Sequence, residues 1–83
     1  MFEIAYSKQA LRFLRRMPAD QATLIRRKIA IYAETPEVLS GQVKKLEDRD
    51  GYRLRVGKWR VLFDWNGNVL EILKIGPRSS IYE

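Results

Sequence analysis

The chain has 83 residues, of which 46% are hydrophobic and 31% charged, as in a small globular domain rather than a disordered chain. Its net charge of +6 favours an acidic partner, either nucleic acid or an acidic protein. It contains no histidine and no cysteine, which excludes the common zinc sites, Ser-His-Asp and Cys-His triads and histidine acid–base chemistry. Any catalysis must therefore come from arginine, lysine, tyrosine, carboxylates or a metal held by oxygen ligands.

Nothing in the sequence divides the chain or directs it to a membrane. No stretch approaches the ~18 apolar residues of a membrane span. The N-terminus has no charged region followed by an apolar run, so it does not resemble a signal peptide. We expect a single domain over residues 1–83, located in the cytoplasm and without membrane contact.

The N-terminal part predicts one strand followed by two helices. Phe2–Tyr6 alternates as a strand does. Ser7 is suited to cap a helix over Lys8–Met17, whose apolar residues recur at helical spacing. Pro18 separates this helix from a second amphipathic helix over Ala19–Glu34. The two helices should form a hairpin with almost no loop.

The polar segment Pro36–Asp50 is expected to be a connection that returns the chain to the sheet, with at most a short helical turn. Its apolar anchors are Val38, Leu39, Val43 and Leu46. Lys44 and Lys45 lie close to the strand that follows.

The segment Tyr52–Phe63 organises the rest of the chain. Apolar and basic residues alternate along it, and Gly57-Lys58 suits a two-residue type II′ turn, which fixes the register. This register places Arg55 opposite Arg60 on adjacent strands. One face of the hairpin then carries Arg53, Arg55 and Arg60, and the other, facing the helices, carries Tyr52, Leu54, Val56, Trp59, Val61 and Phe63.

Asn66-Gly67 predicts a second two-residue turn, of type I′. Its register sets Trp65 opposite Asn68, Phe63 opposite Leu70, Val61 opposite Ile72 and Arg60 opposite Leu73. Pro77 ends the last strand, because proline cannot donate to the ladder. The elements predict an α+β fold, with an N-terminal strand, a helical hairpin and a three-stranded antiparallel meander. They should form one twisted sheet with both helices on one face.

A basic surface on this sheet is the candidate site. Five side chains are expected to converge there: Arg53, Arg55, Arg60, Arg78 and Tyr82. Like charges opposite each other destabilise a sheet, so the paired arginines indicate an anion between them. Guanidinium groups suit phosphate oxygens, and a tyrosine can stack on a base or donate its phenol proton. Basic groups interleaved with aromatic ones are what single-stranded RNA or DNA requires.

Further candidates for RNA contacts are Lys44, Lys45 and Lys58. A magnesium site is the competing chemistry, since Asp64 and Glu71 should fall on one face, diagonally across the second hairpin. A third ligand is missing, so we expect no metal.

The order of elements, the run KKLEDRDGYRLRVGKWRVLFD and the ending LKIGPRSSIYE together resemble the RelE/ParE superfamily of toxins, from type II toxin–antitoxin pairs. The resemblance covers the whole chain. In this superfamily the RelE branch cuts messenger RNA in the ribosomal A site without a metal or other cofactor, and the ParE branch poisons DNA gyrase. The basic positions of the RelE site match Arg53, Arg55, Arg60 and Arg78, and its near-terminal tyrosine matches Tyr82. The resemblance therefore favours the RelE branch.

The reaction implied by this resemblance is attack of a ribose 2′-OH on the adjacent phosphate, giving a 2′,3′-cyclic phosphate and a 5′-OH. Arg60 would stabilise the developing negative charge, Arg78 would lie at the leaving oxygen and Tyr82 would stack on a base. The best-known RelE pattern has lysines where this chain has Arg53 and Arg55. Because arginine hardly ever loses its proton, the general base is left open among Lys58, Lys44, Tyr82 and a ribosomal group.

The resemblance also implies partners. These are the 70S ribosome with its messenger RNA, and an acidic antitoxin with an amphipathic helix and an extended segment, in a toxin–antitoxin hetero-oligomer. Two other functions stay open, a gyrase inhibitor of the ParE kind without nuclease activity and a basic binding module without catalysis.

Overall fold

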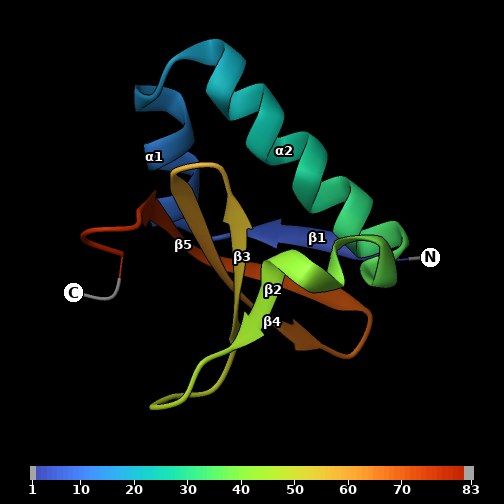
Figure 1. Cartoon of the computed structure of the whole chain (residues 1–83). Helices are drawn as coiled ribbons and strands as arrows, with labels where there is room; N and C mark the ends of the chain where they lie inside the picture. The colour runs from blue at the N-terminus through green and yellow to red at the C-terminus, as the bar shows by residue number, and fades with distance from the viewer. Residues whose placement is uncertain (1, 82–83) are drawn as a thin grey trace.

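The computed structural model describes residues 2–81 and shows a mixed five-stranded sheet with both helices on one face (Figure 1). The strand order is β1-β5-β4-β3-β2, with β1 parallel to β5 and the other pairs antiparallel. The predicted α+β fold is thus confirmed, with one strand more than predicted. The elements are β1 (Glu3–Tyr6), α1 (Lys8–Arg16), α2 (Ala19–Glu34), the 3-10 helix η1 (Pro36–Gln42), β2 (Val43–Lys45), β3 (Tyr52–Val56), β4 (Trp59–Asn66) and β5 (Val69–Pro77).

The first helix begins at the predicted cap. The Ser7 Oγ accepts the N–H of Ala10 at 3.0 Å and donates to the carbonyl oxygen of Leu73 at 2.7 Å. The same hydroxyl therefore satisfies one helix N–H and attaches the start of α1 to β5. The helix ends at Arg16, one residue before the predicted end.

The second helix has the predicted bounds, Ala19–Glu34. Its buried residues, Ile25, Ile29, Tyr32 and Ala33, form one stripe that faces the sheet. Within residues 2–81, neither helix is long and apolar enough to cross a membrane.

The core lies between the two helices and the inner face of the sheet. Phe63 is central to it, with ring centroids 4.9 Å from Tyr32 of α2 and 5.6 Å from Tyr52 of β3. Burying a side chain of this size contributes about 2–3 kcal/mol. The sheet contributes Leu54, Val56, Val61, Phe63, Leu70, Ile72 and Ile75 to this core, and the helices contribute Ala10, Leu14, Ile25, Ile29, Tyr32 and Ala33.

The segment predicted to be a plain connection contains a strand. β2 pairs antiparallel with β3, and Val43 lies opposite Leu54 and Lys44 opposite Arg53. Three residues gave too short a pattern to show alternation in the sequence. A short strand that carries lysines is a common way to end a sheet, because it discourages pairing with another chain.

The predicted register of the second hairpin was wrong. The two central residues of the turn are Gly67-Asn68, so that Asn66 lies opposite Val69. Gly67 has φ +61, and no non-glycine residue between 2 and 81 has a positive φ. A type I′ turn needs positive φ at both central residues, whereas type II′ needs it only at the first. The chain thus places glycine alone at the strained position, and Phe63 pairs with Ile72.

A β-bulge in β5 changes the register again. Phe63 lies opposite Ile72, but Leu62 lies opposite Lys74, so Leu73 is an extra residue without a partner on β4. Because side chains alternate along a strand, the extra residue turns Ile75 into the core. It also brings Lys74 and Gly76 to the outer face, with Gly76 opposite Arg60 in place of the predicted Leu73.

The double role of Ser7 predicts that Ser7→Ala lowers the free energy of unfolding by about 1–2 kcal/mol, because a helix cap and a link to β5 are lost together. Urea unfolding followed by circular dichroism measures this change. Ser40→Ala, on the exposed side of η1, is the matched control. Equal stability of the two variants would contradict the prediction.

Candidate nucleic-acid interface

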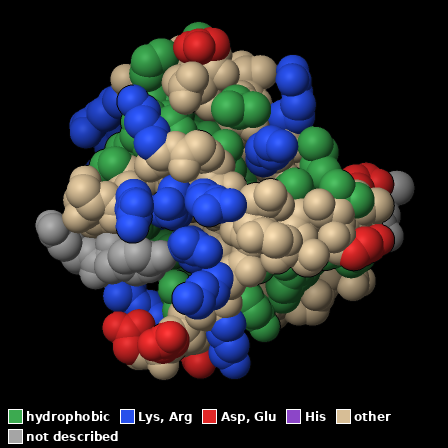
Figure 2. Space-filling model, in the orientation of Figure 1, with side chains coloured by type: hydrophobic (Ala, Val, Ile, Leu, Met, Phe, Trp, Pro, Cys, Tyr) green, Lys and Arg blue, Asp and Glu red, His purple; other side chains and the backbone are tan. Residues whose placement is uncertain are grey.

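The first hairpin has the predicted register, with Arg55 opposite Arg60 and Arg53 opposite Leu62. Its turn is Gly57-Lys58, and Gly57 has φ +58, as type II′ requires. The three arginines therefore share the sheet face opposite the helices. Figure 2 shows basic side chains gathered in the middle of one side of the molecule, with acidic side chains grouped below them.

One row of side chains crosses four strands of this outer face. It runs through Lys44 on β2, Arg53 on β3, Leu62 on β4 and Lys74 on β5. Leu62 is buried, so the row has an apolar middle with cations on both sides. We call it the cationic row.

Lys44 and Arg53 of the cationic row line a hollow of about 210 Å³, together with residues of the loop between β2 and β3. The Arg53 Nε is buried and has no hydrogen-bond partner within residues 2–81. A buried donor without an acceptor is costly, by about 1–3 kcal/mol, and is uncommon in folded proteins.

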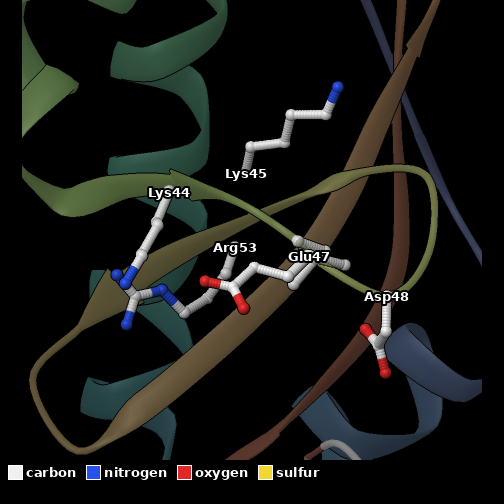
Figure 3. A pocket seen from close by; sticks show the side chains of 6 residues that line it. Lys44, Lys45, Glu47, Asp48 and Arg53 are labelled. Atoms are coloured by element: carbon white, nitrogen blue, oxygen red, sulfur yellow. The ribbon is translucent and has the colours of Figure 1, made fainter.

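The same hollow contains a carboxylate. Leu46, Glu47 and Asp48 also line it, and the loop is closed by a hydrogen bond of 3.0 Å from the N–H of Leu46 to the carbonyl oxygen of Gly51. In Figure 3 the Glu47 carboxylate points toward Arg53, whereas Asp48 and Lys45 point away from it. Asp48 instead lies 3.6 Å from the Nε of Arg49.

Arg60 lies in a different environment. Its side chain is only 7% exposed, and its Nη1 donates to the carbonyl oxygens of Gly57 and Trp59, each at 2.9 Å. Opposite it, Gly76 is covered by Ile81, whose Cδ1 would lie 3.1 Å from a Cβ at that glycine. Arg60 thus stabilises the turn of the hairpin from within the structure.

Arg55 is exposed and lines a second hollow, of about 280 Å³, with Lys28 of α2 and Gln42 of η1. Arg53 belongs to the first hollow instead. The three predicted arginines therefore share a face but occupy three separate environments.

The tail that follows Pro77 begins beside the first turn. The N–H of Arg78 donates to the carbonyl oxygen of Lys58 at 3.2 Å, and the Arg78 side chain is exposed. The Lys58 Nζ lies 5.0 Å from the centre of the Trp59 ring, which packs on the helix side of the sheet. Tyr82 lies outside the described residues.

The acidic pair considered for magnesium lies directly across β4 and β5, not diagonally as predicted. Asp64 is opposite Glu71, and one Asp64 oxygen accepts the N–H of Trp65 at 2.9 Å. Residues 2–81 contain no group of three or more acidic side chains placed to hold a metal ion.

Two side chains near the site were missed in the sequence. The spacing of Leu70, Ile72 and Ile75 is the signal that could have revealed Lys74, since these three cannot share one face without a bulge. Glu47 follows an apolar anchor, Leu46, but its direction depends on the fold of the loop, which periodicity does not specify.

Solved structures share this architecture over almost their whole length. The RelE–RelB complex of Pyrococcus horikoshii OT3 matches with 28% identity and a TM-score of 0.76, over 95% of this chain and 97% of that chain. The RelB–RelE complex of Methanococcus jannaschii matches with 23% identity, a TM-score of 0.74 and 95% coverage of both chains. The YoeB/ParE toxin of Agrobacterium tumefaciens matches with 19% identity and a TM-score of 0.73, over 93% of this chain and 99% of that chain. The fold is that of the RelE-like toxins.

The family assignment comes from the sequence. The family model described as the ParE toxin of type II toxin–antitoxin systems matches residues 4–82. The chain belongs to this toxin family, within the RelE/ParE superfamily. None of the curated proteins matches the sequence closely.

The hydrogen bonds of Arg60 predict that Arg60→Ala lowers the free energy of unfolding by about 1–3 kcal/mol, because two charge-assisted bonds to the turn are lost. Arg55→Ala removes the same charge from the opposite strand position, where the side chain is exposed. It should leave stability nearly unchanged, within about 0.5 kcal/mol. Urea denaturation of both variants checks this, and equal losses would refute the structural role of Arg60.

Proposed function

We propose that this toxin is a ribosome-dependent endoribonuclease that cuts messenger RNA in the A site. The observation that carries the proposal is the hollow beside the cationic row, which Lys44 and Arg53 line together and where the buried Arg53 Nε has no hydrogen-bond partner within residues 2–81. Arginine binds phosphate oxygens with two parallel hydrogen bonds and keeps its charge. The 28% identity to an archaeal RelE supports the same branch of the superfamily.

The proposed reaction breaks the P–O5′ bond by attack of the neighbouring ribose 2′-oxygen on phosphorus. Arg53 and Lys44 hold the non-bridging oxygens, whose negative charge grows in the transition state. Arg78, which is exposed at the start of the tail, lies at the leaving 5′-oxygen, and Tyr82 stacks on a base. We assign Arg60 a supporting role, since its Nη1 is bound to the turn.

We further propose that an acidic antitoxin neutralises the toxin, with an amphipathic helix and an extended segment that covers the cationic row on the outer face of the sheet. The net charge of +6 favours such a partner. The archaeal RelE similar to this chain is bound to RelB in its crystal. The toxin and antitoxin would form a hetero-oligomer in the cytoplasm, where the ribosomes are.

A second candidate function is inhibition of DNA gyrase. The observation that favours it is the family model itself, which describes a ParE toxin. In that case the basic face is a protein-binding surface and the phosphate chemistry is absent.

Arg53→Ala should reduce cleavage by about 10²–10³-fold, because a donor to the developing charge is lost. The measurement is primer extension on a message in a translating extract, with purified toxin added. Arg12→Ala, on the exposed side of α1, makes the same change in charge outside the lining of the hollow and should cut as wild type does.

The tail distinguishes the two functions. Under the nuclease proposal Tyr82→Ala reduces cleavage, whereas gyrase inhibition is indifferent to this change. An intact message together with gyrase–DNA adducts in the same extract would overturn the nuclease proposal.

A further inference from the structure

We propose that Glu47 is the general base of the RNA cleavage, the group that takes the proton from the attacking ribose 2′-OH. This inference rests on the proposed nuclease function. It assigns to Glu47 the role of proton acceptor, which Arg53 and Arg55 cannot fill because arginine keeps its proton.

The position of Glu47 carries the assignment. Its side chain lines the same hollow as Arg53 and Lys44, and in Figure 3 its carboxylate points toward Arg53. The loop that carries it is closed by the bond between Leu46 and Gly51, which holds Glu47 directly after β2. A proton acceptor therefore lies beside the groups proposed to hold the phosphate, as general base catalysis requires.

The Glu47 carboxylate is available to accept a proton. Within residues 2–81 it forms no hydrogen bond or ion pair, so its lone pairs are exposed to whatever enters the hollow. The other carboxylate lining the hollow, Asp48, points away and pairs with Arg49. The guanidinium of Arg53 practically never gives up its proton. Of the two carboxylates that line the hollow, Glu47 is thus the acceptor in position.

The charges around Glu47 are compatible with an RNA phosphate. Lys44 and Lys45 come from β2, Arg53 comes from β3, and the loop adds Asp48. With three cations and two carboxylates the hollow stays positive, so a phosphate can approach a carboxylate there. When Glu47 becomes neutral by taking the proton, its repulsion of the increasingly negative phosphoryl group disappears, which favours the transition state.

The step balances in atoms and electrons. The 2′-O–H bond breaks and its proton goes to a Glu47 carboxylate oxygen, while the 2′-oxygen forms a bond to phosphorus. The P–O5′ bond breaks, its electron pair stays on the 5′-oxygen, and that oxygen takes a proton from water. Glu47 then returns its proton to water, which leaves a 2′,3′-cyclic phosphate, a 5′-OH and the starting protein.

The test is single-turnover cleavage of a message on purified ribosomes, with Glu47→Gln compared with Asp50→Asn. The two variants remove the same charge from the same loop, but Asp50 is exposed and does not line the hollow. We expect Glu47→Gln to slow cleavage by about 10²–10⁴-fold at unchanged ribosome affinity, and Asp50→Asn to cut as wild type does.

The dependence of the rate on pH separates a base from a merely structural residue. In Glu47→Gln hydroxide must remove the proton, so the residual rate should rise about tenfold per pH unit, more steeply than in wild type. Equal or faster cleavage by Glu47→Gln would mean that this carboxylate only shields the cations, and overturns the assignment while the nuclease function stands. A wild-type toxin that leaves ribosome-bound messages intact overturns both.

Discussion

Two hydrogen bonds from Arg60 stabilise the turn of the β3–β4 hairpin, and the placement of the core and of the outer face depends on this hairpin. They fix the β3–β4 register at its closed end, and this register determines which side chains lie under the helices and which lie on the outer face. The carbonyl oxygens they satisfy belong to Gly57 and Trp59, next to the point where the tail begins. The guanidinium of Arg60, which the sequence suggested as a substrate contact, thus stabilises the hairpin. The cations that line the hollow are Arg53 and Lys44, further along the strands.

The parts of the fold that local chemistry determines could be predicted from the sequence. The cap at Ser7, both helices and the turn at Gly57 each depend on residues close together in the chain. The rest depended on competition between distant segments. From the sequence alone, Gly67 could be the first or the second central residue of the second turn. In the structure it is the first, the position where a type II′ turn requires a positive φ. The bulge at Leu73 depends on burying Ile75 against the helices, which no local pattern specifies.

The sequence predicted which face of the sheet carries the arginines of the candidate site, but not what surrounds each of them. Alternation along the hairpin placed Arg53, Arg55 and Arg60 on one face, as found. It could not show that one lies beside a loop carboxylate, one beside α2 and one inside the turn, because each outcome depends on segments that pack against the strand from elsewhere. Glu47 was not predicted for the same reason. It lies in a loop, where side-chain directions follow no periodic pattern that the sequence could reveal.

The single extra residue in β5 has a consequence for both ends of the strand. Before the bulge, β5 is committed to the core through Leu70 and Ile72; beyond it, the strand offers Gly76 to the outer face, where Ile81 fills the space left by the missing side chain. Even-numbered residues of β5 face the core before Leu73, and odd-numbered residues face it after Leu73. Ile72 and Ile75, three positions apart, can therefore both face the helices, which a regular strand would not allow.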